Sequence, residues 1–121
     1  MIGIGIDLVE MDRFRVALQR SPGLVDRVFT DGERAYALAK RDPTERFAVR
    51  FAAKEAVMKA MGVGLGEVRM RDIEVARADS GRPAIVLHGT ARARADELGI
   101  VAWKISLTHA AHAAEAVAVA L

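Results

Sequence analysis

The sequence contains no cysteine, and this absence excludes several kinds of protein. Without thiols there is no disulfide framework, no thiolate nucleophile and no zinc site with cysteine ligands. Long apolar runs are also missing, since no stretch approaches the ~20 residues that a membrane-spanning helix needs. The opening residues, MIGIGIDLVEMD, lack the basic segment that begins a signal peptide. We therefore expect a soluble, cytoplasmic protein that has no membrane segment.

The chain has little excess charge of either sign. Its 18 basic residues face 16 acidic ones, which leaves a formal net charge of +2. A nucleic-acid-coating protein is therefore not indicated, and a charged partner must be met by a local patch. The 121 residues, 52% hydrophobic and 28% charged, suffice for one globular core but not for two. We expect a single domain over residues 1–121.

The strand pattern predicts an α+β fold. The first seven residues alternate between isoleucine on one face of a strand and Gly3, Gly5 and Asp7 on the other. The glycine face allows another backbone or a ligand to come close. Further strands are expected near 72–77, 84–88, 101–108 and 115–121, with Val101 pointing inward and the last two strands forming a hairpin. The first strand then joins a small, mostly antiparallel sheet packed with helices.

Helices are expected over 9–20, from a capping box at Thr30–Glu33 to about residue 40, and over 91–98. Glu33 has a second interpretation, a role near a functional site. The longest helix should begin with Asp42 as its N-cap and Pro43 as its first residue, and it should end at Gly62. These signals predict one long central helix of about five turns.

The segment RFAAKEAVMKAMG in this helix carries charges on a surface that is otherwise apolar. Glu55 and Lys59 lie on a strip whose other members are Ala48 and Ala52. They could form a solvent-facing ion pair worth ~0.3–0.5 kcal/mol. However, the alanines leave room for a bulky partner, and Asp7 ends a strand face that is equally bare. One carboxylate from each bare face could hold a hard divalent cation such as Mg²⁺, with Lys59 beside it to meet a phosphate.

Five segments together resemble a known family in order and spacing. They are GIDLVEMDR at 5–13, FTDGE at 29–33, RFAAKEAVMKAMG at 50–62, GRP at 81–83 and SLTH at 106–109. The whole chain resembles the holo-[acyl-carrier-protein] synthases, the small, free-standing group of 4′-phosphopantetheinyl transferases. The resemblance implies their fold and an enzyme that uses Mg²⁺ to move the phosphopantetheine arm of coenzyme A onto a serine of apo acyl carrier protein, releasing 3′,5′-ADP. It also implies a homotrimer with active sites between subunits.

The resemblance also assigns site residues. It implies that Asp7 and Glu55 are Mg²⁺ ligands and that Lys59 binds the coenzyme phosphates, which makes these three residues catalytic. The further coenzyme contacts that it implies are Lys40, Arg41, Arg50, Lys54, Gly81, Arg82, Pro83, Thr108 and His109. Arg82 stands where the family usually has lysine, so the charge is kept and the geometry changes. Whether Glu55, Asp7 or a water removes the serine proton is left open, as are the carrier proteins accepted and the use of acylated coenzyme A.

A basic helix face is the expected contact for the carrier protein. Arg13 and Arg20 lie seven residues apart, on one face of the helix that follows Asp7. Acyl carrier proteins are acidic in this family's biology, and the family pattern G-x-D-x-x-x-x-x-R ends at Arg13. The alternatives are a solvated helix face, and an Arg13 that braces the turn after Asp7.

Two other functions use parts of the same pattern. A metal-dependent hydrolase of the coenzyme A pyrophosphate would need the same carboxylates and lysine, with water in place of the serine. A non-catalytic module that binds an acidic protein would need the basic helix alone and would leave Asp7 and Glu55 unexplained. A zinc site is not indicated, because His109 and His112 lack a suitably spaced third ligand.

Overall fold

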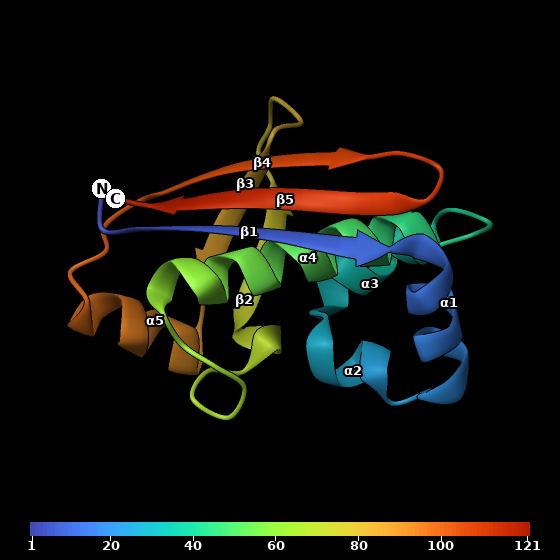
Figure 1. Ribbon diagram of the computed structural model, residues 1–121, viewed down its shortest axis with the longest axis horizontal. Coiled ribbons are helices and arrows are strands. Elements are labelled where there is room, and N and C mark those ends of the chain that lie inside the picture. Colours follow the sequence, from blue (N-terminus) through green and yellow to red (C-terminus); the bar gives the residue numbers. More distant parts are fainter.

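A sheet made from the two ends of the chain organises the molecule. The computed structural model describes residues 1–121, and in it β1 (Gly3–Glu10) pairs antiparallel with β5 (Ala113–Ala120). β5 also pairs antiparallel with β4 (Trp103–His109), so the strand order is β1-β5-β4. Both termini consequently lie at the same end of the sheet (Figure 1). The expected hairpin and the antiparallel position of the first strand are confirmed.

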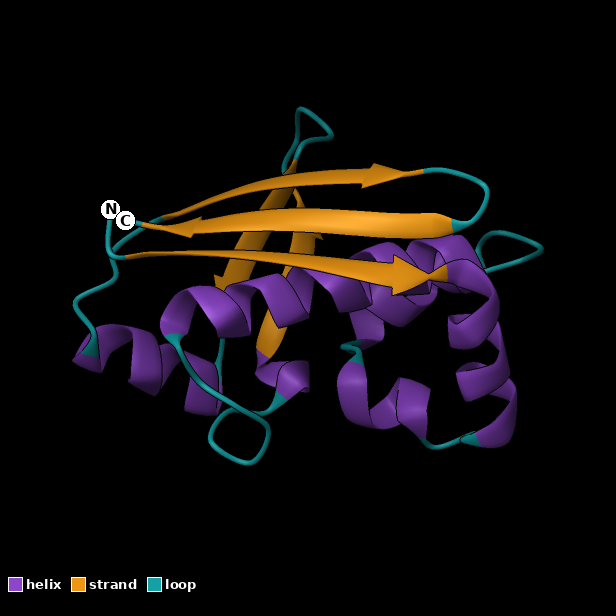
Figure 2. Ribbon diagram, viewed as in Figure 1, coloured by secondary structure: helices purple, strands orange, loops and turns teal.

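Helices cover one face of this sheet (Figure 2). The longest, α4 (Thr44–Met61), runs along the sheet and packs against β1 and β5. The other helices are α1 (Met11–Arg20), α2 (Leu24–Val28), α3 (Asp31–Leu38) and α5 (Gly89–Glu97). A second antiparallel pair, β2 (Ile73–Arg77) and β3 (Pro83–Leu87), follows the short 3₁₀ helix η1 (Met70–Asp72) and runs across the direction of the longer strands (Figure 2). The α+β prediction is confirmed, and none of the helices combines the length and the apolar composition needed to cross a bilayer.

The glycine face of β1 is covered by the backbone of α4. A Cβ atom built on Gly3 would overlap the carbonyl oxygen of Ala60, and one built on Gly5 would overlap that of Ala56. On the same helix Ala48 and Ala52 are completely buried. The small residues therefore allow the helix and its own sheet to pack closely, and the expectation that the alanine strip leaves room for a bulky partner is wrong.

The other face of the sheet is left open to solvent. Ile4, Ile6 and Leu8 expose 59%, 54% and 60% of their surface. The strand register sets Val119 beside Ile4 and Val117 beside Ile6. We call this apolar surface the outer face. A row of this size on an isolated chain indicates a contact surface for another molecule.

Several element boundaries differ from the predictions by one or two residues. α1 begins at Met11 because β1 continues to Glu10, which pairs with Ala113. α4 begins one residue late because Pro43 is its N-cap and the Asp42 carboxylate accepts a hydrogen bond from the Thr44 N–H at 3.1 Å. The predicted stop at Gly62 is confirmed, since this glycine has a φ of 70° in the left-handed region.

Two further differences are substantive. Val101 is 89% exposed, so its predicted inward position is wrong; β4 begins two residues later. The five-residue helix α2 was not predicted, because it is too short to show a periodic pattern. The capping box of α3 is confirmed, with the Thr30 hydroxyl accepting from the Glu33 N–H and the Glu33 carboxylate accepting from the Thr30 N–H.

Candidate functional site

The close contact of β1 with α4 brings Asp7, Glu55 and Lys59 together. The Lys59 ammonium donates to the Asp7 carboxylate at 3.1 Å and to the carbonyl oxygen of Ile6 at 2.9 Å. It forms no ion pair with Glu55, so the alternative of a solvent-facing pair along the helix is wrong. Two of the three ammonium N–H groups are used, and the third remains available for an acceptor from outside the chain.

The carboxylate of Glu55 has no partner in the chain. Burial raises the pKa of Glu55, the nearby charge of Asp7 raises it further, and Lys59 opposes both effects. A cation bound by both carboxylates would remove the repulsion between Asp7 and Glu55. The chain has no group of three or more His, Cys, Asp or Glu side chains that could ligate a metal together. Mg²⁺ typically takes one or two protein carboxylates and leaves its remaining positions to water and phosphate oxygens. The residues present therefore fit a magnesium ion.

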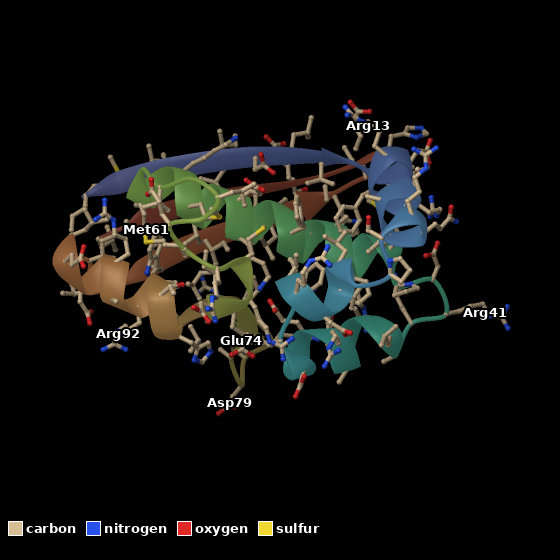
Figure 3. All side chains as sticks on the ribbon, turned by 90° about the horizontal axis from the view of Figure 1, so that it is seen from below. Arg13, Arg41, Met61, Glu74, Asp79 and Arg92 are labelled. Atoms are coloured by element: carbon tan, nitrogen blue, oxygen red, sulfur yellow. The ribbon has the colours of Figure 1, made fainter.

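Asp7 and Glu55 line one surface cavity of about 570 Å³, which we call the carboxylate cavity. Arg13, at the start of α1, also lines it and projects outward there (Figure 3). Phe14 and Phe51 form an apolar part of the wall, with their ring centroids 5.3 Å apart. The cavity thus has a polar region formed by the carboxylates and an apolar wall formed by helices α1 and α4.

A second cavity of about 340 Å³ gathers basic residues, and we call it the arginine cavity. Five of the coenzyme contacts implied by the resemblance line it: Lys40, Arg50, Gly81, Pro83 and His109. Its only carboxylate, Glu45, lies 3.3 Å from the Lys40 ammonium and 3.4 Å from the His109 ring. The cavity therefore keeps a surplus of positive charge, which suits an anion.

Tyr36, Arg46 and Arg77 also line the arginine cavity, and the sequence reasoning did not assign them to the site. A signal was present for Arg46, which lies four residues before Arg50 and so on the same side of the helix. Arg77 pairs across the hairpin with Pro83. No local pattern indicates Tyr36, which reaches the cavity from α3.

The predicted coenzyme contact of Lys54 is wrong. This side chain is fully buried, and its ammonium donates to the Glu33 carboxylate at 2.8 Å, to the Met70 carbonyl oxygen at 3.0 Å and to the Ile73 carbonyl oxygen. All three N–H groups are therefore used inside the protein. Burial lowers the pKa of Lys54, and the charge of Glu33 opposes this effect. Lys54 belongs to the core, where it ties α4 to α3 and β2.

The remaining predicted contacts lie outside both cavities. Arg41 projects into solvent from the loop before α4 (Figure 3) and lines a neighbouring hollow with Lys40. Arg82 is exposed in the β2–β3 turn, and Thr108 is exposed on β4. The carboxylate cavity and the arginine cavity share no residue, so one chain alone does not unite the proposed metal ligands with the proposed coenzyme contacts.

Comparison with known proteins gives one consistent result. Residues 3–119 match the family described as the 4′-phosphopantetheinyl transferase superfamily. The holo-[acyl-carrier-protein] synthase of Streptomyces avermitilis is 49% identical over 120 residues, which cover 99% of this chain and 97% of that protein. The corresponding protein of Moorella thermoacetica is 48% identical over 118 residues, with 98% and 92% covered.

Solved structures agree with this result. The crystal structure of holo-[acyl-carrier-protein] synthase from Neisseria meningitidis superposes with a TM-score of 0.90 at 30% identity, covering 100% of this chain and 99% of that one. The Helicobacter pylori protein of the same name, crystallised in complex with coenzyme A, gives a TM-score of 0.85 at 30% identity and covers 98% and 99%.

Proposed function

Because this chain belongs to the 4′-phosphopantetheinyl transferase superfamily, we propose that it is a holo-[acyl-carrier-protein] synthase. It transfers the 4′-phosphopantetheine arm of coenzyme A to a serine of apo acyl carrier protein and releases 3′,5′-ADP. The main support for this proposal is that Asp7 and Glu55 line one cavity, with Lys59 bound to Asp7, while the same chain has a separate basic cavity. These are the parts that phosphoryl transfer from a nucleotide requires.

The reaction forms a bond between the serine oxygen and the phosphorus of the phosphopantetheine arm, while the bond from that phosphorus to the ADP oxygen breaks. Mg²⁺ held by Asp7 and Glu55 would neutralise charge on the pyrophosphate. The free N–H of Lys59 donates to a phosphate oxygen, and the bond from Lys59 to Asp7 fixes where that donor points. The proton of the serine hydroxyl leaves to one of the carboxylates or to water.

The mass of the carrier protein tests this function directly. Apo acyl carrier protein incubated with this protein, Mg²⁺ and coenzyme A should gain the mass of one phosphopantetheine group, and 3′,5′-ADP should appear in equal amount. A parallel reaction without the carrier separates transfer from hydrolysis. Release of 3′,5′-ADP in that control, with no modified carrier in the complete reaction, would show a hydrolase instead.

We also propose that the active site is shared between copies of the chain in a homotrimer. The separation of the two cavities and the exposed outer face both support this assembly. A second copy that covers the outer face removes its apolar side chains from water, and it can bring its own arginine cavity to the carboxylates of the first copy.

Mixing two inactive variants should restore activity if the site is shared. The first variant, Asp7→Ala, lacks a metal ligand, and the second, Arg50→Met with His109→Ala, lacks coenzyme contacts. Co-expressed in equal amounts, they assemble at random, and about a quarter of the shared sites receive both intact halves. We expect a steady-state rate near that fraction of the wild-type rate. A mixture as inactive as its components would mean that each site lies within one chain.

The basic face of α1 is the proposed contact for the carrier protein. Arg13 lines the carboxylate cavity, where the carrier serine must arrive, and Arg20 ends the same helix.

We expect Arg13→Glu and Arg20→Glu each to raise the KM for the acidic carrier about tenfold and to leave the KM for coenzyme A nearly unchanged. The same reversal at Arg69, an exposed residue on a distant loop, is the control. Added salt should weaken carrier binding more in wild type than in the variants, because exposed charges are screened beyond ~8 Å. An unchanged KM and salt dependence in both reversals would place the docking surface elsewhere.

A further inference from the structure

The hairpin of β2 and β3 has two outer edges, and one of its hydrogen bonds shows which backbone groups point toward them. The N–H of His88 donates to the carbonyl oxygen of Asp72 at 2.8 Å. In an antiparallel pair, residues whose backbone groups face the partner strand alternate with residues whose groups face outward. The residues that face outward include Ile73 and Val75 on β2, and Ile85 and Leu87 on β3.

The outer edge of β2 is closed by the buried ion pair of the core. The Val75 N–H donates to the Glu33 carboxylate at 2.9 Å, and the carbonyl oxygen of Ile73 accepts from the Lys54 ammonium. The outer edge of β3 has no strand beside it, since β3 pairs with β2 alone. Backbone groups on a free edge are a template on which another strand can pair. The hairpin therefore has one closed edge and one open edge.

The open edge of β3 borders a cavity of about 450 Å³, which we call the α5 groove. Eight of its ten lining residues are apolar, among them Ile85 and Leu87 on β3 and Ala95 on α5. Val101 and Trp103, from the segment that leads into β4, also line it. Side chains of a strand point alternately to its two faces. A strand paired with β3 would therefore place every second side chain in this apolar cavity.

The two charged residues of the α5 groove neutralise each other. The Arg92 guanidinium, which lies at the outside of the molecule (Figure 3), donates to the Asp96 carboxylate at 3.2 Å. No surplus charge remains to attract an anionic lipid or an acidic peptide. The groove instead matches an uncharged chain that offers backbone N–H and C=O groups together with apolar side chains.

A second copy of residues 1–121 has no suitable strand to offer. Its longest connection between elements, residues 62–69, folds back on itself through a bond from the Glu67 N–H to the Gly64 carbonyl oxygen at 3.3 Å. The strands β1, β4 and β5 are paired with one another. The occupant of the groove must therefore come from a different protein.

We propose that the α5 groove docks an uncharged, extended segment of a partner protein, which adds to the open edge of β3 as a further strand and packs apolar side chains against Trp103. The groove shares no residue with the carboxylate cavity or the arginine cavity. A partner bound there leaves both cavities open, so docking is separate from the proposed transfer reaction.

Fluorescence of Trp103 tests the docking, because it is the only tryptophan of the chain. The probe is a capped nine-residue peptide with lysine at each end for solubility and threonine alternating with valine between. We expect a saturable shift of the emission to shorter wavelength as the peptide displaces water from the indole. The same peptide with every amide nitrogen methylated keeps its side chains but cannot donate, and it should bind at least about tenfold more weakly. No saturable shift up to about 1 mM peptide, or equal binding of both peptides, would overturn the proposal.

Hydrogen exchange shows whether the peptide pairs with the strand edge. The amides of Ile85 and Leu87 should exchange fast in the free protein and slowly with the peptide, whereas the amide of Val86, which faces β2, should be slow in both. A fluorescence shift without protection of the two amides would reveal an apolar pocket only and would overturn strand addition. Protection that rises with protein concentration in the absence of peptide would show that a second copy covers the edge, and would overturn the assignment to a different protein.

Two variants complete the test. Ile85→Pro removes an outward N–H, and proline fits there because Pro83 already occupies the equivalent position two residues earlier. Val101→Asp places a charge in the groove at a residue that is 89% exposed, so its melting temperature should not change. Both variants should weaken peptide binding at least about tenfold and leave phosphopantetheine transfer unchanged. Leu38→Asp, at an exposed apolar residue that ends α3, is the matched control.

The outcomes for the groove and for the proposed function are separate. Equal affinity of Val101→Asp and wild type for the peptide would overturn the docking proposal and leave the proposed function intact. A protein that binds the peptide with protection of Ile85 and Leu87 but transfers no phosphopantetheine would support the docking proposal and overturn the proposed function.

Discussion

Replacing either Asp7 or Glu55 with alanine should abolish phosphopantetheine transfer, with a loss of at least about 100-fold in rate at saturating Mg²⁺. Each side chain supplies one of only two carboxylates at the proposed metal site. The fold should survive both changes, because neither side chain belongs to the apolar core. Relief of the repulsion between the carboxylates should leave the melting temperature of Glu55→Ala equal to that of wild type or slightly higher. Carrier modification followed by intact mass, together with circular dichroism on heating, measures both quantities.

Controls separate loss of the metal from loss of the protein. Glu67→Ala, which removes an exposed carboxylate just beyond α4, should leave the rate unchanged. The apparent Mg²⁺ affinity, taken from the dependence of the wild-type rate on metal concentration, sets the level that counts as saturating. A rate within a few-fold of wild type for either alanine variant at that level would remove the residue from the proposed ligand set.

Replacing Lys54 with methionine should destabilise the protein by about 3–5 kcal/mol, since the Glu33 carboxylate would remain buried without its counter-charge. For a domain of this size the loss corresponds to a fall of about 10–20 °C in melting temperature. The two backbone carbonyl oxygens that accept from Lys54 would also lose their donor. Thermal unfolding at one fixed protein concentration is the measurement, because assembly makes the melting temperature concentration-dependent.

A double substitution distinguishes the ion pair from simple packing. In Lys54→Met with Glu33→Gln no charge is left unpaired, and the single carbonyl oxygen of the glutamine can still accept one of the two backbone hydrogen bonds that Thr30 and Val75 donate to separate oxygens of Glu33. We expect the double variant to recover a substantial part of the stability that the single variant loses. A double variant as unstable as the sum of its single variants would indicate that the two residues do not act as a pair.

The sequence was informative where the signal is local. The capping box at Thr30 and the stop at Gly62 depend on a few neighbouring residues, and the structure confirms both. The same holds for the hairpin of β4 and β5 and for the bare face of β1. The pairing of β1 with β5 joins the two ends of the chain and could be expected only in outline, because no local pattern sets the register between distant strands.

The site shows where local reasoning stops. Lys54 and Arg50 lie four residues apart on one helix, and from sequence both resemble surface cations. The structure separates them, because the side of α4 that carries Lys54 faces the Glu33 carboxylate and two backbone carbonyl oxygens, whereas Arg50 reaches the arginine cavity. Tyr36 was missed because its contacts come from distant parts of the chain. The guanidinium groups of Arg46 on α4 and Arg77 on β2 lie over its ring, and its neighbours in the sequence do not indicate this contact.

The bare face of β1 limits how the carboxylate site can vary. At Gly5 the strand already touches the backbone of α4, so no smaller residue exists that could bring Asp7 nearer to Glu55. Even alanine would push the strand away from the helix. Every substitution at this position therefore acts in the same direction and widens the gap. The strand and the helix that carry the two carboxylates therefore lie at the closest approach that their backbones can reach, and variation at Gly5 can only move Asp7 away from α4.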